Sequence, residues 1–203
     1  MRKIVVNAMM MFLCANVYCQ NQESKHNIKF GFNLGLNYSN IQVRNADPAV
    51  QYFNSEGFRL GILLDWKLTK HLSFSPKAET SINNPKVLVT SSSNERKFYQ
   101  VFPTLFEFAL HLTYKFSNNN TTPYLLFGPT YKLQNSFGRK KSDYAAWGSD
   151  IAIDLGFGLD KKLTFFNIAP EFRYSFGLIN LSNIKEVGQL YFHNITLVLN
   201  FKG

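Results

Sequence analysis

The fold is decided first by residues 28–38, IKFGFNLGLNY, in which apolar and polar side chains alternate without a break. Successive side chains of a β-strand point to opposite faces, so this period of two predicts a strand with one apolar and one polar face. The same period recurs in seven further segments: 57–68, 71–82, 101–116, 123–133, 150–160, 166–177 and 194–202. Most of these segments reach the roughly 9–11 residues with which a tilted strand crosses a bilayer.

The two faces of the predicted strands differ sharply in charge. No position on the apolar face carries a charged side chain. The charged residues of the opposite face are Lys29, Arg59, Asp65, Lys67, Lys77, Glu79, Glu107, Lys115, Lys132, Asp150, Asp154, Asp160, Glu171, Arg173 and Lys202. This partition indicates an apolar face that never meets water. Alternation alone leaves open whether that face points into a soluble barrel or outward into lipid.

Two features of composition favour the outward arrangement. The polar face is rich in glycine, which makes room for side chains in a narrow barrel, where the interior of eight strands is only just wide enough to be filled. Aromatic residues gather at both ends of the strands, for example Trp66 and Tyr114 at one end and Tyr38, Phe58 and Phe102 at the other. Aromatic girdles at both rims are typical of a membrane interface.

The lengths of the connections alternate in the same sense. The second, fourth and sixth links, at 69–70, 117–122 and 161–162, are short. The other four links, at about 42–56, 83–98, 135–149 and 178–190, are long. Outer-membrane barrels have short periplasmic turns and longer outer loops. We therefore predict an all-β protein, an eight-stranded antiparallel up-and-down transmembrane β-barrel, closed by its first and last strands because lipid tolerates no open sheet edge.

Four prolines interrupt the alternating segments. Pro76, Pro129 and Pro170 lie on the apolar phase, and Pro103 lies on the other. Proline has no N–H for a strand ladder, so it is expected at a bulge or a strand end. A second interpretation for Pro129 and Pro170 is a shift of the strand register by one residue.

The first nineteen residues predict a secretory signal peptide. Basic Arg2 and Lys3 precede an apolar run from Ile4 to Leu13, and a polar sequence begins at Gln20. This order of basic, apolar and cleavage regions is the signature of export, and the apolar run is too short to span a bilayer. The predicted organisation is a signal peptide at 1–19 and an outer-membrane β-barrel domain at 20–203.

The composition excludes several classes of protein. The 203 residues include 22 Lys+Arg and 13 Asp+Glu, a formal charge of +9, with 16% aromatic and 17% charged residues. There are too many aromatic and β-branched residues for a disordered chain. The positive charge does not predict nucleic-acid binding, because the sequence has no basic helix and its aromatics belong to the apolar face. No motif for a cofactor or a metal is found, and none is predicted.

Four segments resemble the PorT-like outer-membrane β-barrel family of Gram-negative bacteria. They are KFGFNLGLNYSNI (29–41), TPYLLFGPTYKL (122–133), DIAIDLGFGLD (150–160) and EFRYSFGLINL (171–181). The fourth predicted strand, VFPTLFEFALHLTYKF (101–116), departs from the family pattern in length and lacks the acidic residue expected two positions before its proline. The resemblance implies eight strands and an outer-membrane location. It implies no particular activity.

The candidate site is a set of charged side chains on the polar phase: Arg59, Lys77, Glu79, Glu107, Glu171 and Arg173. Buried charges must pair, and the mixture of signs permits it. We interpret the set as a structural network that fills the lumen, with an ion or proton path as the alternative. His111 lies on the same phase near Glu107 and Lys115. It is interpreted as a structural histidine because no nucleophile is evident beside it.

The predicted function is that of a monomeric structural or interaction protein of the outer membrane, without catalysis. Its predicted surroundings are outer-membrane lipid and lipopolysaccharide, which basic loop residues at 94–97 and 138–141 would contact. Protein partners would bind the long outer loops. Two alternatives remain. One is a soluble periplasmic or secreted barrel that binds a lipophilic ligand, and the other is an outer-membrane lipid-modifying enzyme that uses His111.

Overall fold

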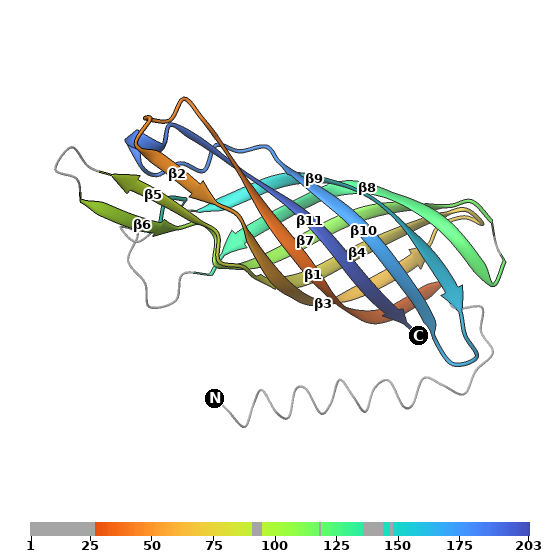
Figure 1. Cartoon of the computed structure of the whole chain (residues 1–203). Coiled ribbons are helices and arrows are strands. Elements are labelled where there is room, and N and C mark those ends of the chain that lie inside the picture. Colours follow the sequence, from red (N-terminus) through yellow and green to blue (C-terminus); the bar gives the residue numbers. More distant parts are fainter. Residues whose placement is uncertain (1–26, 91–94, 118, 136–143, 147) are drawn as a thin grey trace, which may run out of the picture.

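A computed structural model describes residues 27–90, 95–117, 119–135, 144–146 and 148–203. Eight strands form a closed antiparallel barrel in the order β1-β11-β10-β9-β8-β7-β4-β3 (Figure 1). The barrel strands are β1 (Ile28–Arg44), β3 (Ser55–Lys67), β4 (Leu72–Ile82), β7 (Thr104–Lys115), β8 (Thr121–Gln134), β9 (Ser149–Lys162), β10 (Asn167–Gly177) and β11 (Gln189–Lys202). This result confirms the predicted fold class. The predicted signal peptide at 1–19 lies outside the described residues.

The barrel closes by pairing of its first and last strands. Residues Gly31 to Arg44 of β1 pair with Lys202 to Gln189 of β11 in one continuous register. The remaining neighbours are consecutive barrel strands, joined at one end by short turns at 68–71, 116–120 and 163–166. The last of these turns falls later than predicted because β9 continues to Lys162. The closed ladder leaves the barrel without an open edge.

Three of the four long connections contain regular structure that the alternation did not predict. A separate sheet has the order β2-β5-β6, formed by β2 (Val50–Phe53), β5 (Lys86–Thr90) and β6 (Arg96–Gln100). A 3₁₀ helix, η3 (Lys185–Val187), precedes β11. In Figure 1 the small sheet lies beyond the end of the barrel, opposite the short turns.

The apolar face of the barrel strands points outward, as predicted. In β1, Phe30 is 59% and Leu36 65% exposed, whereas Asn33 and Asn37 on the other phase are buried. The inward face therefore carries the charged side chains. This arrangement overturns the alternative of a soluble barrel with an apolar ligand cavity, because the apolar side chains are on the outside.

Phe102 does not follow the predicted alternation. It was assigned to the outward face and to an aromatic girdle, but it is fully buried. Its backbone is left-handed, with φ of 47°, and β7 begins only at Thr104. A left-handed residue breaks the strand geometry, so the Phe102 ring turns over the barrel end, where it meets Phe192 edge-on at 5.5 Å between ring centroids.

The prolines cause no register shift. The pairing of β8 with β9 is continuous through Pro129, and the pairing of β10 with β11 is continuous through Pro170. On the other edge of each of these strands, the residues beside the proline have no paired partner. Pairing resumes beyond them in the same register, between β7 and β8 for Pro129 and between β9 and β10 for Pro170. A missing N–H thus removes local hydrogen bonds without displacing the strand. Pro103 lies just before β7, as expected for a strand end.

Two glycines show why the narrow barrel needs residues without a side chain. A Cβ at Gly158 would collide with the ring of Tyr124, so this glycine makes room for a lumen side chain, as the sequence suggested. At Gly128 the obstacle is instead the backbone carbonyl of Leu110 on the neighbouring strand. The second case reflects close approach of two strand backbones, which the sequence pattern does not distinguish from the first.

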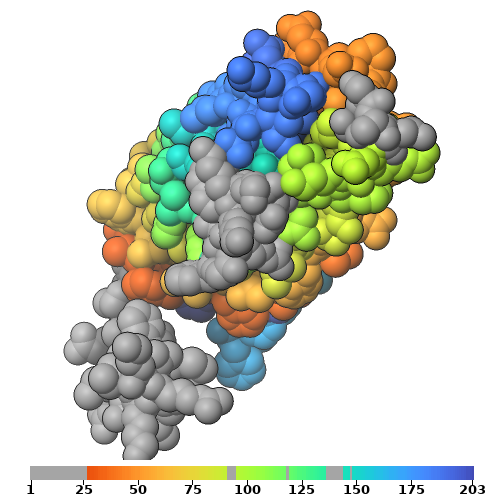
Figure 2. Space-filling model, turned by 90° about the vertical axis from the view of Figure 1, so that its left-hand side faces the viewer, coloured from red at the N-terminus to blue at the C-terminus, as the bar shows by residue number. Residues whose placement is uncertain are grey.

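An apolar cluster, here called the cap, lies at the end with long connections. Its buried members are Ile41, Val87, Val101, Phe102, Leu105, Ala145, Ala146, Leu181, Val187, Leu190 and Phe192. They come both from the ends of barrel strands and from the connections between them. Figure 2 views the molecule from this end, where β2, the β5–β6 hairpin and the blue link before β11 crowd together. The main apolar core of the described residues therefore lies over one mouth of the barrel.

Candidate functional site

Six charged side chains form one alternating chain across the middle of the lumen. In order, the chain runs Glu107–Arg59–Glu79–Arg173–Glu171–Lys77. The successive N···O distances are 2.8, 2.7, 2.7, 2.8 and 2.6 Å. The structure thus brings together all six residues proposed from the sequence. All are at least nine-tenths buried, and their charges cancel.

The alternating chain joins strands that are far apart around the barrel. Arg59 of β3 bridges the carboxylates of Glu79 on β4 and Glu107 on β7. Arg173 of β10 reaches across the lumen to both oxygens of Glu79 and also binds its own strand neighbour Glu171. Because a guanidinium presents five N–H donors in a planar fork, each arginine can hold two carboxylates. The two arginines therefore tie opposite walls of the barrel together.

Neutral side chains complete this centre. Asn33 donates to Glu79 at 2.7 Å, Ser81 donates to Glu107 at 2.7 Å, and the Tyr124 hydroxyl donates to Glu171 at 3.0 Å. These are charge-assisted bonds. Tyr124 donates to the Glu171 oxygen that the cations leave free, whereas Asn33 and Ser81 donate to oxygens that an arginine also contacts. Sequence reasoning did not assign a role to Tyr124. The feature of the sequence that could have revealed this role is a tyrosine on the polar phase of β8, between outward-facing apolar residues.

His111 does not contact Glu107 or Lys115 as its sequence position suggested. Its Nε2 lies 3.0 Å from Asp154 of β9, and the Thr130 hydroxyl donates to the same carboxylate oxygen at 2.7 Å. The imidazole is fully buried. Asp154 also lies 3.7 Å from Arg173, so the histidine belongs to the edge of the alternating chain.

A second polar layer closes the short-turn end of the lumen. Lys115 lies 3.1 Å from Asp65 and 3.2 Å from Asp160, and Lys202 lies 3.3 Å from each of the same two carboxylates. These four side chains form an alternating ring, here called the lysine–aspartate ring. The remaining oxygens accept from Ser75 and Asn167. Tyr124 separates this layer from the alternating chain, with its ring 5.5 Å from the Lys202 ammonium.

The layer beneath the cap is more loosely paired. Lys132 and Asp150, opposite each other on β8 and β9, approach only to 3.8 Å. The Lys132 ammonium also lies 5.1 Å above the ring of Phe192, a member of the cap. A cation over an aromatic face gains electrostatic stabilisation. This lysine therefore marks the boundary between the polar lumen and the apolar cap.

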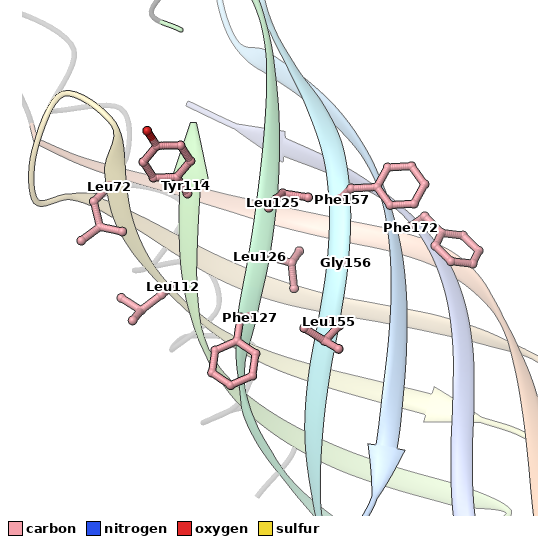
Figure 3. Close-up of a pocket in the computed structure, with 10 residues that line it drawn as sticks. All are labelled: Leu72, Leu112, Tyr114, Leu125, Leu126, Phe127, Leu155, Gly156, Phe157 and Phe172. Atoms are coloured by element: carbon pink, nitrogen blue, oxygen red, sulfur yellow. The ribbon is translucent and has the colours of Figure 1, made fainter. Parts of the chain in front are cut away.

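The outer surface is an apolar belt with aromatic residues toward both ends. Trp66, Tyr114 and Phe116 are exposed near the short turns, and Tyr38 and Tyr131 are exposed toward the cap. Figure 3 shows a shallow groove in this belt, about 470 Å³ in volume, lined by side chains from β4, β7, β8, β9 and β10. Its lining is apolar apart from the Tyr114 hydroxyl, which suits contact with hydrocarbon.

Within the described residues, no group of three or more His, Cys, Asp or Glu side chains is placed to hold a metal ion. In the same part of the chain, no helix is long and apolar enough to cross a membrane. Of the predicted basic loop segments, 138–141 and Asn94 lie outside the described residues.

A closed barrel with an ionised interior and an apolar, aromatic-rimmed exterior defines a transmembrane β-barrel. The chain belongs to the outer membrane protein beta-barrel domain family, whose model matches residues 6–202. The protein is located in the cell outer membrane. From the general rule for such barrels, we expect the short turns to face the periplasm and the long connections and cap to face the exterior.

Three solved structures with a similar fold are distant from this chain in sequence. Neisserial surface protein A (NspA) is 12% identical, with a TM-score of 0.55, and the match covers 85% of this chain and 95% of that one. OprG from Pseudomonas aeruginosa is 16% identical over 87% of this chain and 94% of its own, with a TM-score of 0.47. Ail, the attachment invasion locus protein of Yersinia pestis, is 11% identical over 87% and 99%, with a TM-score of 0.44. No curated protein matches the chain.

Proposed function

We propose that this protein is a structural or interaction protein of the outer membrane, with a lumen closed to solutes and with outer connections that bind other molecules. The observation that carries the proposal is the alternating chain of buried ion pairs across the lumen. An eight-stranded barrel has an interior only just wide enough for side chains. Charged side chains that are fully paired fill it and leave no continuous aqueous path.

The energetics support a plug in preference to an ion path. Removing one partner of a buried pair costs about 3–5 kcal/mol because it leaves an uncompensated charge. An ion path through the centre would require Arg173 to release Glu79 and Glu171 together. The cap adds a second closure on the outer side, since its apolar side chains would have to separate before water entered.

The geometry around His111 supports a structural role over lipid-modifying catalysis. The imidazole is buried in the lumen and pairs with Asp154. An acyl chain in the bilayer meets the outer face of the barrel, so it cannot reach this side chain. The neighbouring hydroxyl of Thr130 donates to the aspartate rather than to the histidine, so it is not arranged as a nucleophile activated by a base.

The outer sheet offers the surface for recognition. Phe53 of β2 is 47% and Phe98 of β6 is 59% exposed, and their ring centroids lie 6.3 Å apart. Exposed aromatic pairs are unusual on a surface without a partner, and aromatic residues are enriched at the centres of interfaces. Lys97, stacked 4.9 Å above Tyr99 on the same hairpin, adds a positive charge that would suit lipopolysaccharide phosphates. We propose a monomer in outer-membrane lipid that uses this sheet to bind lipopolysaccharide or a protein.

We further assign the chain to the PorT-like group within its family. The four resembling segments support this assignment, because each supplies lumen residues: Asn33 from 29–41, Tyr124 and Gly128 from 122–133, Asp154 from 150–160, and Glu171 with Arg173 from 171–181. A structure of a PorT-like protein whose corresponding segments do not build a lumen ion-pair chain would contradict the assignment.

Reconstitution into planar bilayers tests the closed lumen. The folded protein should give no stable conductance across the voltage range in which porins conduct. The double variant Arg173→Gly/Glu79→Gly removes the ion pair that spans the lumen. It serves as the positive control for an opened lumen. Steady single-channel conductance by the wild-type protein would overturn the proposal.

A further inference from the structure

The mouth of the barrel at the short turns is lined by more lysines than carboxylates. Within the lysine–aspartate ring, Lys115 and Lys202 neutralise Asp65 and Asp160. Both carboxylates also accept a hydrogen bond from a neutral side chain, Ser75 or Asn167. Their hydrogen-bonding capacity is therefore largely committed within the ring. Any further lysine at this mouth adds net positive charge.

Three further lysines lie on the lumen phase of the same mouth. Lys29 of β1, Lys67 of β3 and Lys162 of β9 line one polar pocket together with Asn27, Asp65, Lys115, Thr122, Asp160 and Asn167. The pocket has a volume of about 100 Å³. Four lysines and two aspartates in one lining give the pocket a net positive charge.

Lys29 is the most buried of the three lysines outside the lysine–aspartate ring. Its ammonium donates to the neutral Asn167 side-chain oxygen at 3.1 Å. An ammonium has three N–H donors, so Lys29 retains donors for a further acceptor. The Lys29 side chain is half-buried: it is less exposed than Lys67 and more exposed than the aspartates of the lysine–aspartate ring. A partly buried cation with spare donors is stabilised by an anion placed beside it.

We propose that this pocket binds a small oxyanion, a phosphate or carboxylate group presented from the periplasm. The size of the pocket restricts the ligand to a small group, since pockets for drug-sized molecules are about 300–1,000 Å³. The ligand group sits against Lys29, with Lys67 and Lys162 at the entrance and the lysine–aspartate ring as the floor. The site adds a periplasmic binding function to a barrel whose outer sheet is proposed to bind partners on the other side of the membrane.

Titration with inorganic phosphate tests the site. The folded full-length mature protein is placed in nanodiscs of zwitterionic phospholipid, and its backbone amide NMR signals are followed at constant ionic strength, with chloride replaced by phosphate. We expect saturable shifts at Lys29, Lys67 and Asn167. The double variant K29Q/K67Q should bind phosphate about tenfold more weakly, as expected for the loss of charge-assisted hydrogen bonds.

The matched control is R44Q/K185Q, which removes two exposed cations, one at the end of β1 and one in η3, at the opposite end of the molecule. It should bind phosphate as the wild-type protein does. Equal weakening in both double variants, or unchanged binding in K29Q/K67Q, would overturn the proposal. If K29Q/K67Q fails to show the gel mobility of the folded barrel, K67Q alone is used. Lys67 is exposed, and a loss of about threefold is expected from its more solvated charge.

Nanodiscs with anionic phospholipid distinguish the source of the oxyanion. A lipid headgroup as the source would shift the same amide signals without added phosphate, and K29Q/K67Q would abolish that shift. A soluble periplasmic source leaves these signals unchanged until phosphate is added. Both results support the oxyanion site, whereas shifts that follow only the total salt concentration contradict it.

Discussion

The central lumen and the cap are both buried, but they are closed by opposite kinds of side chain. The lumen is filled by paired charges that reach across the barrel, and the cap is filled by apolar residues from strand ends and connections. Polar side chains line the lumen because the outward phase of every barrel strand is used for contact with lipid. The cap lies beyond the lipid, where connections fold over one another, so apolar residues can face inward again. Apolar side chains therefore point outward along the barrel wall and inward in the cap.

The largest effect is expected from Arg173→Met in the central lumen. The change removes the cation that binds both Glu79 and Glu171 and leaves two buried carboxylates short of a partner. The free energy of unfolding should fall by about 3–5 kcal/mol. Urea titration of the folded barrel in detergent, followed by gel mobility without boiling, measures the change. Arg44→Met at the outer end of β1, where the arginine stacks on Tyr191, is the control and should cost less than about 1 kcal/mol.

Phe192→Ala tests the cap by the same titration. Phe192 is fully buried and packs against Phe102, so the variant leaves a cavity in the apolar cluster. A loss of about 3 kcal/mol is expected, at the lower end for buried phenylalanine because the cap borders solvent-facing connections. Phe165→Ala, at a position 91% exposed in the β9–β10 turn, is the control for loss of a phenylalanine. If the two variants are equally stable, the cap contributes nothing to stability.

A double variant at Lys77 and Glu171 separates the loss of an ion pair from the cost of a buried charge that has lost its partner. Lys77→Met alone removes a partner of Glu171, at 2.6 Å, and is expected to destabilise the barrel. Adding Glu171→Gln removes the uncompensated charge, so K77M/E171Q should recover about 1–2 kcal/mol relative to K77M. A double variant no more stable than K77M would mean that Arg173 alone compensates the charge of the Glu171 carboxylate. No such rescue by a second substitution is expected in the cap, because removing an apolar side chain there leaves no uncompensated charge.

The smallest effect on stability is expected at the outer sheet. Phe53→Ser with Phe98→Ser removes two exposed rings and should change the free energy of unfolding by less than about 0.5 kcal/mol for each substitution. Binding should respond instead. Retention of the folded protein on vesicles that contain lipopolysaccharide, and cross-linking to surface proteins of intact cells, should both be compared with the wild-type protein. If neither changes, the aromatic pair is not the recognition surface.

The central lumen was accessible from sequence because it depends on local alternation. Arg59, Glu79 and Glu171 fall on the polar phase of their strands, and the order of the strands around a closed barrel follows the order of the chain. Their alternation of sign across the lumen then follows from the need to pair buried charges. The partner of His111 was missed because Asp154 lies two strands away, on β9, and the stagger of the strands, which the alternation does not specify, sets which side chains meet.

The cap was not accessible in the same way. Phe102 follows the apolar phase of its segment, and only its left-handed backbone turns it inward. Val87, Ala145 and Val187 lie in three different connections, none of which shows a periodic pattern. Their association depends on how long links pack over the mouth, which involves contacts between residues far apart in the chain. The register at Pro129 and Pro170 was likewise decided by the neighbouring strands that remain fully paired.

The sequence by itself determined the number of barrel strands, the inward and outward faces within those strands and the end at which the short turns lie. These features follow from a side-chain period of two and from the rule that lipid accepts neither charge nor an open edge. Only the tertiary structure decided which charges meet, where the cap forms and how the lysines gather at the short-turn mouth. Those features depend on the stagger and closure of the barrel, because closure sets the distance between side chains that face each other from different strands.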